Sequence, residues 1–195
     1  GRPPASEDES FHDRGAYPRP HGARVAALPS AMLPGPYQLP AYRVGAHYRL
    51  TNKTPAATYR APGRFEGAFV RERLMDAIAQ RLGLDRLDVR RRNLISRAEM
   101  PFRRDLSAIG DEVEFDSGDY AGLLDKSLSR IGWAALQKDL ARRRATGETV
   151  GAGVAMFVEK SGLGPRDSAY VTVDGSGGVE VLTGSASSGQ GVETV

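Results

Sequence analysis

The sequence has no cysteine and only three histidines among 195 residues. Without cysteine, the chain cannot form a disulfide, bind an iron–sulfur cluster or offer a thiolate to a metal. The histidines, His12, His21 and His47, show no spacing with carboxylates that is typical of a metal site. We therefore expect no direct metal ligand in this chain.

Long apolar runs and a strong net charge are also lacking. No run of 18 apolar residues occurs, so we expect no membrane span. The net charge of +3 is too small to indicate a nucleic-acid partner. Two arginine runs, residues 90–92 and 142–144, fall near the ends of predicted helices, where we expect them to complement the helix dipole and face solvent. A nucleic-acid-binding module built on these runs is an alternative that predicts steeply salt-dependent binding.

Common catalytic motifs are missing as well. There is no Gly-x-Ser-x-Gly elbow for a serine nucleophile and no phosphate loop. Gly151-Ala-Gly153 lacks the third glycine of a dinucleotide fingerprint and opens a predicted strand rather than a helix. Glu66, Glu72 and Asp76 lie among arginines on one predicted helix, which indicates a charged face rather than an acid/base pair.

What is present is the composition of a globular protein, 40% hydrophobic and 26% charged, enough for one domain or two small ones. The chain opens on Gly1 instead of methionine and stops just after a glycine-rich turn, so we expect it to be an internal part of a longer polypeptide. Periodicity and turn signals predict irregular structure over 1–40, a strand over 41–51, and helices over 65–82 and 85–95 with Asp85 as N-cap. A polar connection over 97–118 and a helical stretch from 119 to 140 with a break at Gly132 are expected to follow. The last part is predicted to contain strands over 150–160, 169–174 and 179–183, and the turn residues 174–178 indicate that the last two form a hairpin.

One candidate site is the stretch TYRAPGRFEGAF, residues 58–69. Arg60 and Arg64 flank the turn dipeptide Pro62-Gly63 directly before a predicted helix. Exposed helix amides and fixed guanidinium groups together favour an anion. The alternative is that the arginines pair with a local carboxylate such as Glu66.

A second candidate is the stretch SASSGQG, residues 185–191, which follows a predicted strand. Its small side chains allow a large ligand to approach the backbone, where successive N–H groups can bind oxyanions. Gln190 can both donate and accept, which suits the edge of a heterocycle. The alternative is a flexible glycine- and serine-rich loop.

Two long blocks in the same order resemble one family. TNKTPAATYRAPGRFEGAFVRERLMDAIAQRLGLDRLDVRRRNLI (51–95) and GAGVAMFVEKSGLGPRDSAYVTVDGSGGVEVLTGSASSGQGVET (151–194) resemble the molybdopterin-binding large subunit of the molybdenum hydroxylases, the xanthine dehydrogenase and aldehyde oxidase family. The similarity covers most of 31–195 and is closest to the carbon-monoxide-dehydrogenase-like large chains. It implies an α+β fold made of parts of two molybdopterin-binding subdomains. Residues 1–148 would be the C-terminal part of the first subdomain with a helical connection, and residues 149–195 the start of the second.

The resemblance also implies the ligand of both candidate sites. Arg60 would contact the molybdenum cofactor, and the turn Ala61-Pro62-Gly63 would form part of the pocket wall facing the metal. The segment Gly189-Gln190-Gly191 would hold the pterin. The cofactor would be molybdopterin, in its cytosine dinucleotide form. Iron–sulfur and FAD centres would lie on a small and a medium partner subunit, which would accept electrons from the oxidation of a small-molecule substrate with oxygen derived from water.

Some residues depart from the family pattern, and these departures bear on the expected metal site and activity. Copper-containing carbon monoxide dehydrogenases have a cysteine directly after the Tyr-Arg pair, where this chain has Ala61, so a molybdenum–copper site is disfavoured. Xanthine dehydrogenases have phenylalanine where Pro62 stands, which disfavours purine oxidation. Val192 follows the Gly-Gln-Gly segment where many relatives have histidine.

The resemblance further implies a catalytic glutamate in a Gly-Glu context near the C-terminus of the large subunit. No residue of this chain matches it, so we expect no catalytic residue here and no turnover by these residues alone. The alternative is a non-catalytic assembly module or degenerate large chain that binds no cofactor. Relatives occur in the cytoplasm and facing the periplasm, and we expect the cytoplasm.

Overall fold

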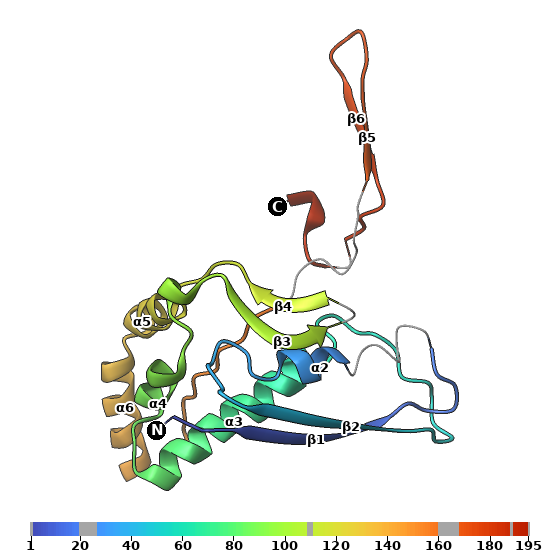
Figure 1. Ribbon diagram of the computed structural model, residues 1–195. Helices are drawn as coiled ribbons and strands as arrows, with labels where there is room; N and C mark the ends of the chain where they lie inside the picture. Colours follow the sequence, from blue (N-terminus) through green and yellow to red (C-terminus); the bar gives the residue numbers. More distant parts are fainter. Residues whose placement is uncertain (1, 20–26, 109–110, 160–167, 188, 195) are drawn as a thin grey trace. The chain divides into compact units, whose positions relative to one another are not determined.

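The computed structural model describes residues 2–19, 27–108, 111–159, 168–187 and 189–194 (Figure 1). The chain divides into two compact units, Gly1–Glu159 and Lys160–Val195, and each is described by itself. Helices and strands are mixed, and the strands of the described residues form three separate pairs, so the fold is α+β as predicted. The predicted subdomain junction at residue 148 stays a prediction. Among the described residues, no helix is both long and apolar enough to cross a membrane.

The N-terminal forty residues are not irregular throughout, so that prediction was wrong. Strand β1 (Ser6–Asp13) pairs in parallel with β2 (Tyr42–Arg49), and the short helix α2 (Ala27–Met32) lies between them in sequence. The strand predicted over 41–51 is confirmed as β2. Four of the eight residues of β1 are acidic, a composition that is unfavourable for strands. Pairing with β2 therefore makes this segment a strand, which local sequence could not indicate.

Helices α3 (Arg64–Leu82) and α4 (Arg86–Asn93) confirm the predicted helices. Gly83 ends α3 in the left-handed region, with φ of 64°, and its N–H donates to two carbonyls of the last turn. The Asp85 carboxylate accepts from the N–H groups of Leu87 and Asp88, so it is the N-cap of α4.

The predicted polar connection over 97–118 was wrong. It contains a 3₁₀ turn, η1 (Arg97–Glu99), and an antiparallel pair, β3 (Phe102–Ala108) and β4 (Asp111–Phe115). The alternation of apolar and polar residues expected for a strand is interrupted at Arg104, because this side chain points inward. Its Cζ atom lies 5.3 Å from the ring centroid of Phe102 and 5.4 Å from that of Phe115. Burial, and then the charge of Arg71, lower the pKa of Arg104 to about 10.

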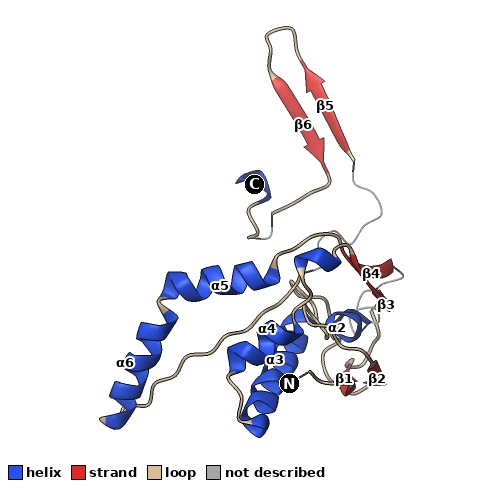
Figure 2. Ribbon diagram, turned by 60° about the vertical axis from the view of Figure 1, so that its left-hand side comes forward, coloured by secondary structure: helices blue, strands red, loops and turns tan. Residues whose placement is uncertain are grey.

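Two further helices follow as predicted, α5 (Tyr120–Ile131) and α6 (Trp133–Ala145). The predicted break is Gly132, whose φ of 64° is left-handed, and Figure 2 shows the change of helix direction there.

Two buried clusters hold the first unit together. The first contains Tyr37, Met75, Ala79, Leu87, Val89, Leu94, Leu124, Leu128 and Met156, and the second contains Leu28, Ala31, Met32, Ile95, Val113 and Phe115.

The predicted strand over 150–160 was wrong for 150–159, and residue 160 lies outside the described residues. Residues 150–159, which we call the connecting segment, are extended but belong to no described sheet. Their burial alternates as in a strand, with the even positions inward and Met156 most buried. Arginine side chains replace a neighbouring strand as donors to its carbonyls: Arg144 to Val150, Arg86 to Ala152 and Arg71 to Met156, at 2.9, 3.3 and 2.6 Å.

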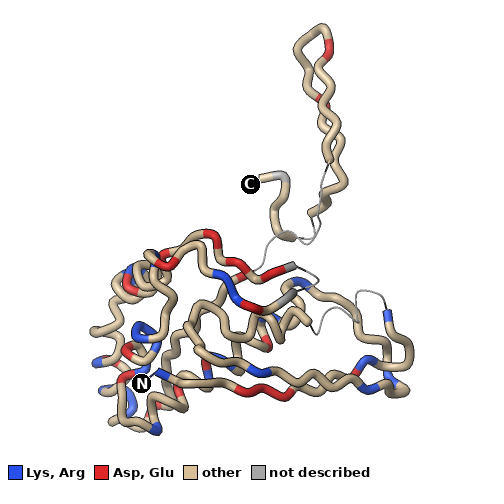
Figure 3. Tube along the Cα trace, in the orientation of Figure 1, with Lys and Arg blue, Asp and Glu red and all other residues tan. Residues whose placement is uncertain are grey.

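The arginine run 90–92 was predicted to face solvent, and for Arg90 this was wrong. Arg90 is fully buried, whereas Arg91 and Arg92 are exposed. Its Nε donates to the Glu72 carboxylate at 2.9 Å and its Nη1 to Asp76 at 2.8 Å. Burial by itself would lower the pKa of Arg90, but the Asp76 hydrogen bond and the charge of Glu72 raise it. Figure 3 shows basic and acidic positions interspersed along this unit.

In the second unit, β5 (Ala169–Val173) and β6 (Val179–Thr183) form the predicted antiparallel hairpin. The Asp174 carboxylate accepts from the N–H groups of Ser176 and Gly178, which closes the turn. After β6 the chain enters the glycine-rich stretch, and a short 3₁₀ turn, η2 (Val192–Thr194), follows it.

Candidate functional site

The turn before α3 is unusual in its backbone. Ala61 has φ of 56°, a left-handed conformation that costs a residue with a Cβ roughly 1–2 kcal/mol. Gly63 is also left-handed, with φ of 74°, and a Cβ built on it would lie 2.1 Å from Pro29 Cγ. The Arg64 N–H donates to the Ala61 carbonyl at 3.1 Å and closes the turn. The turn is thus held by its packing on α2.

The four predicted site residues of this turn differ in exposure. Arg60 is exposed, Ala61 is half-buried, and Pro62 and Gly63 are buried. Within the described part of the chain, no hydrogen bond or ion pair joins Arg60 to another residue. Its guanidinium therefore carries a charge that no described carboxylate compensates, next to the first turn of a 19-residue helix.

Arg64 differs from Arg60, although the sequence places both beside the same turn. Its side chain is only 7% exposed and forms an ion pair with Glu159 at the end of the connecting segment. Neither arginine pairs with Glu66 among the described residues. Sequence reasoning missed Glu159, since it lies far from Arg64 in sequence and in a segment predicted to be an ordinary strand.

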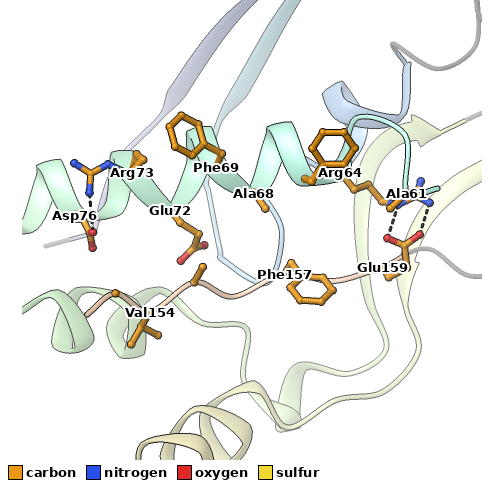
Figure 4. Close-up of a pocket in the computed structure, with 13 residues that line it drawn as sticks. Ala61, Arg64, Ala68, Phe69, Glu72, Arg73, Asp76, Val154, Phe157 and Glu159 are labelled. Carbon is orange, nitrogen blue, oxygen red and sulfur yellow. Dashed lines mark hydrogen bonds and ion pairs between the residues drawn. The ribbon is translucent and has the colours of Figure 1, made fainter. Parts of the chain in front are cut away.

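A pocket of about 620 Å³ lies between α3 and the connecting segment (Figure 4). Ala61 borders it, so it adjoins the predicted cofactor turn. Three aromatic side chains, Phe65, Phe69 and Phe157, also line it and are 55%, 70% and 70% exposed. The lining is mostly apolar, which suits a small uncharged molecule or ring.

The charged residues of this pocket are compensated. Glu72 is buried, contrary to the predicted charged face, and accepts hydrogen bonds from Arg71, Arg90 and Tyr37. Burial, and then the Glu72 charge, raise the pKa of Tyr37, so its hydroxyl stays protonated and donates. Because the Glu72 carboxylate already accepts hydrogen bonds from two arginines, we assign it to the support of the pocket rather than to proton transfer.

The other predicted site residues lie in the second unit. Gly189 has φ of 101° and Gly191 has φ of 76°, so both positions favour glycine. A Cβ built on Gly189 would meet no described atom within 4 Å, which leaves its backbone open to a ligand. The Gln190 amide nitrogen donates to the Ala186 carbonyl at 3.0 Å, and the Gly191 N–H donates to Ser187 Oγ at 3.3 Å.

Taken by itself, each of the two segments suits contact with part of a large anionic cofactor. The exposed Arg60 guanidinium suits oxyanions, and the open backbone at Gly189 suits close approach by a large ligand. Neither segment offers a metal ligand, and the described residues contain no group of three His, Cys, Asp or Glu that can hold a metal ion. His21 lies outside the described residues. Protein contacts in such a site would fall on the organic and phosphate parts of the cofactor.

Comparison with known proteins identifies a family. Residues 1–94 match a family described as a molybdopterin cofactor-binding domain, and residues 126–195 match a second family with the same description. The 6-hydroxypseudooxynicotine dehydrogenase complex subunit gamma of Paenarthrobacter nicotinovorans is 38% identical over the whole chain, which covers 25% of that protein. The carbon monoxide dehydrogenase large chain of Hydrogenophaga pseudoflava is 29% identical over 89% of the chain and 24% of its own length.

The fold has a counterpart among solved structures. Quinoline 2-oxidoreductase from Pseudomonas putida 86 matches with a TM-score of 0.86 and 33% identity, over 97% of this chain and 25% of the other. The chain thus spans about a quarter of the length of the relatives it matches.

Proposed function

Because the chain belongs to the molybdopterin-binding large subunits of the molybdenum hydroxylase family, we propose that residues 60–63 of its first unit and residues 189–191 of its second unit bind molybdopterin. The observation that carries this proposal is the exposed Arg60 guanidinium at the strained turn beside the pocket, with which no described carboxylate pairs. When bound, the cofactor supplies the two-electron oxidation of a substrate carbon with oxygen that comes from water.

The residues of the first unit divide into two roles. Arg60 donates charge-assisted hydrogen bonds to an oxygen of the cofactor, because it is exposed and no carboxylate of the described residues pairs with it. Ala61 presents a methyl group at the pocket, and because it offers no thiolate at this position it disfavours copper there. Pro62 and Gly63 are buried and shape the turn that carries these two residues.

In the second unit, the Gly189-Gln190-Gly191 segment binds the pterin. Gly189 allows the ligand to approach the backbone, and Gln190 and Gly191 are held by hydrogen bonds to the preceding loop. We propose the cytosine dinucleotide form of the cofactor, which acid hydrolysis would reveal by release of CMP. Release of no nucleotide would contradict this form.

The substrate and the partner subunits extend the proposal to the whole polypeptide. The apolar pocket beside Ala61 suits a small organic substrate. One relative is named as a subunit of a dehydrogenase complex and another as a large chain. In line with these names, we propose an iron–sulfur small subunit and an FAD-binding medium subunit as electron acceptors. The base that activates water would come from residues outside this chain. The compartment stays a prediction.

Arg60→Ala in the native polypeptide tests the role of the turn. Loss of a hydrogen bond to a charged group costs roughly 1.5–3 kcal/mol, or about 10- to 150-fold in affinity. We expect a matching loss of molybdopterin and molybdenum from the purified protein. Arg81→Ala removes an exposed arginine at the far end of α3 and should leave both contents unchanged. Equal contents in Arg60→Ala and wild type would refute the assignment.

A further inference from the structure

The ion pair between Arg64 and Glu159 lies where the chain leaves the first unit. Arg64 Nε donates to Glu159 Oε2 at 2.6 Å, and Arg64 Nη2 contacts Glu159 Oε1, so both carboxylate oxygens are engaged (Figure 4). A two-point contact of this kind fixes direction as well as distance. It holds the last residue of the connecting segment against the first residue of α3.

Arg64 depends on this carboxylate. Its side chain is 93% removed from solvent, and its Nη1 is buried without a hydrogen-bond partner in the described structure. No other described carboxylate forms an ion pair with it. Removal of the Glu159 charge would leave a buried guanidinium without a counter-ion, which is far more costly than breaking an exposed pair.

Arg64 is also part of the cofactor turn. Its N–H closes the turn on the Ala61 carbonyl at 3.1 Å, and Ala61 lies in the left-handed region. A displaced Arg64 side chain would therefore disturb the backbone that carries Arg60 and Ala61. Glu159 is the last residue of the first unit, so this contact lies at the end of the connecting segment.

We propose that Arg64 and Glu159 are a positioning pair for the cofactor. The pair fixes the turn at residues 60–63 against the end of the connecting segment, and so holds the backbone that carries Arg60 in place. Neither residue takes part in the chemistry. This inference rests on the proposed function, because it requires a molybdopterin that the turn at residues 60–63 contacts.

The test is the rate at which the purified native enzyme loses its cofactor. Glu159→Gln, isosteric but uncharged, should release molybdopterin about tenfold faster at a temperature well below unfolding, as measured by pterin fluorescence in the filtrate. Glu159→Asp keeps the counter-ion and should release it more slowly than Glu159→Gln. Glu148→Gln is the control, because Glu148 also pairs with an arginine, with Arg143 Nε and Nη2 both contacting Glu148 Oε2 at the exposed end of α6.

Each outcome has one meaning. If wild type holds no molybdopterin, the proposed function itself fails. If wild type holds it and Glu159→Gln releases it at the wild-type rate, the function stands and the positioning pair is refuted. A lower unfolding temperature with an unchanged release rate would show a purely structural ion pair and would equally refute the inference.

Discussion

Arg90 is the residue whose replacement tests the physical account of this fold most directly. In the Arg90→Ala variant, the buried guanidinium and its hydrogen bonds to Glu72 and Asp76 are removed together. The Glu72 side chain is only 6% exposed, so it would stay buried with less compensation. It would keep the hydrogen bonds from Arg71 and Tyr37, which limits the penalty.

The expected loss is about 3 kcal/mol, the lower end of the range for breaking a buried ion pair. For a chain of this size it corresponds to roughly 6–12 °C in the unfolding temperature. Circular dichroism melts and urea titrations of the variant and the wild type would measure it. The sequence itself provides the control, because Arg92 belongs to the same arginine run but is exposed. Arg92→Ala should change stability by no more than about 0.5 kcal/mol.

A double-mutant cycle sharpens the test. Since Arg90 and Glu72 share a hydrogen bond of 2.9 Å, Arg90→Ala and Glu72→Gln should be strongly non-additive, with an interaction energy of about 1–3 kcal/mol. A loss for Arg90→Ala no larger than that for Arg92→Ala, or simple additivity of Arg90→Ala and Glu72→Gln, would contradict a buried ion pair that stabilises the fold.

Two further predictions concern backbone and pH. Gly63→Ala should destabilise the chain more than Gly83→Ala. Both glycines have positive φ, but only at Gly63, of these two, would an added Cβ collide, since it would lie 2.1 Å from Pro29 Cγ. Equal losses of about 1–2 kcal/mol for the two variants in thermal melts would contradict the packing of this turn. Hydrogen bonds, first from Thr51 and then from neighbouring backbone, lower the pKa of Asp13 from 3.8 to about 2. This carboxylate therefore adds stability above pH 4 that is lost as the pH falls toward 2. Asp13→Asn should remove that part of the pH dependence of the unfolding free energy. The same pH dependence in Asp13→Asn and wild type would refute the assignment.

Local signals were sufficient for the helices. Helix α3 begins and ends at glycines with left-handed backbones, and α4 begins at the Asp85 cap, all of which the sequence displays directly. The break at Gly132 and the hairpin closed by Asp174 were predicted for the same reason. In each case a few adjacent residues decide the backbone conformation.

Pairing between distant segments was not readable in the same way. The acidic β1 is a strand only because β2 pairs with it, and β3 contains an inward arginine, Arg104, that breaks the apolar alternation. For the connecting segment, a strand was predicted where no sheet forms. The burial of residues 150–159 alternates as in a strand, yet arginine side chains take the place of a neighbouring strand as hydrogen-bond donors.

By itself, the sequence determined the helical framework, the two glycine-containing segments and the resemblance that comparison bore out as membership of a molybdopterin-binding family. Only the tertiary structure decided which arginine side chains are exposed and which are buried against a carboxylate. Arg60 and Arg64 look alike in sequence, but one is exposed and the other is buried against Glu159. The same holds for Arg90 and Arg92. The reason is physical: the state of a charged side chain depends on burial and on a counter-ion, and both come from residues that are distant in the chain.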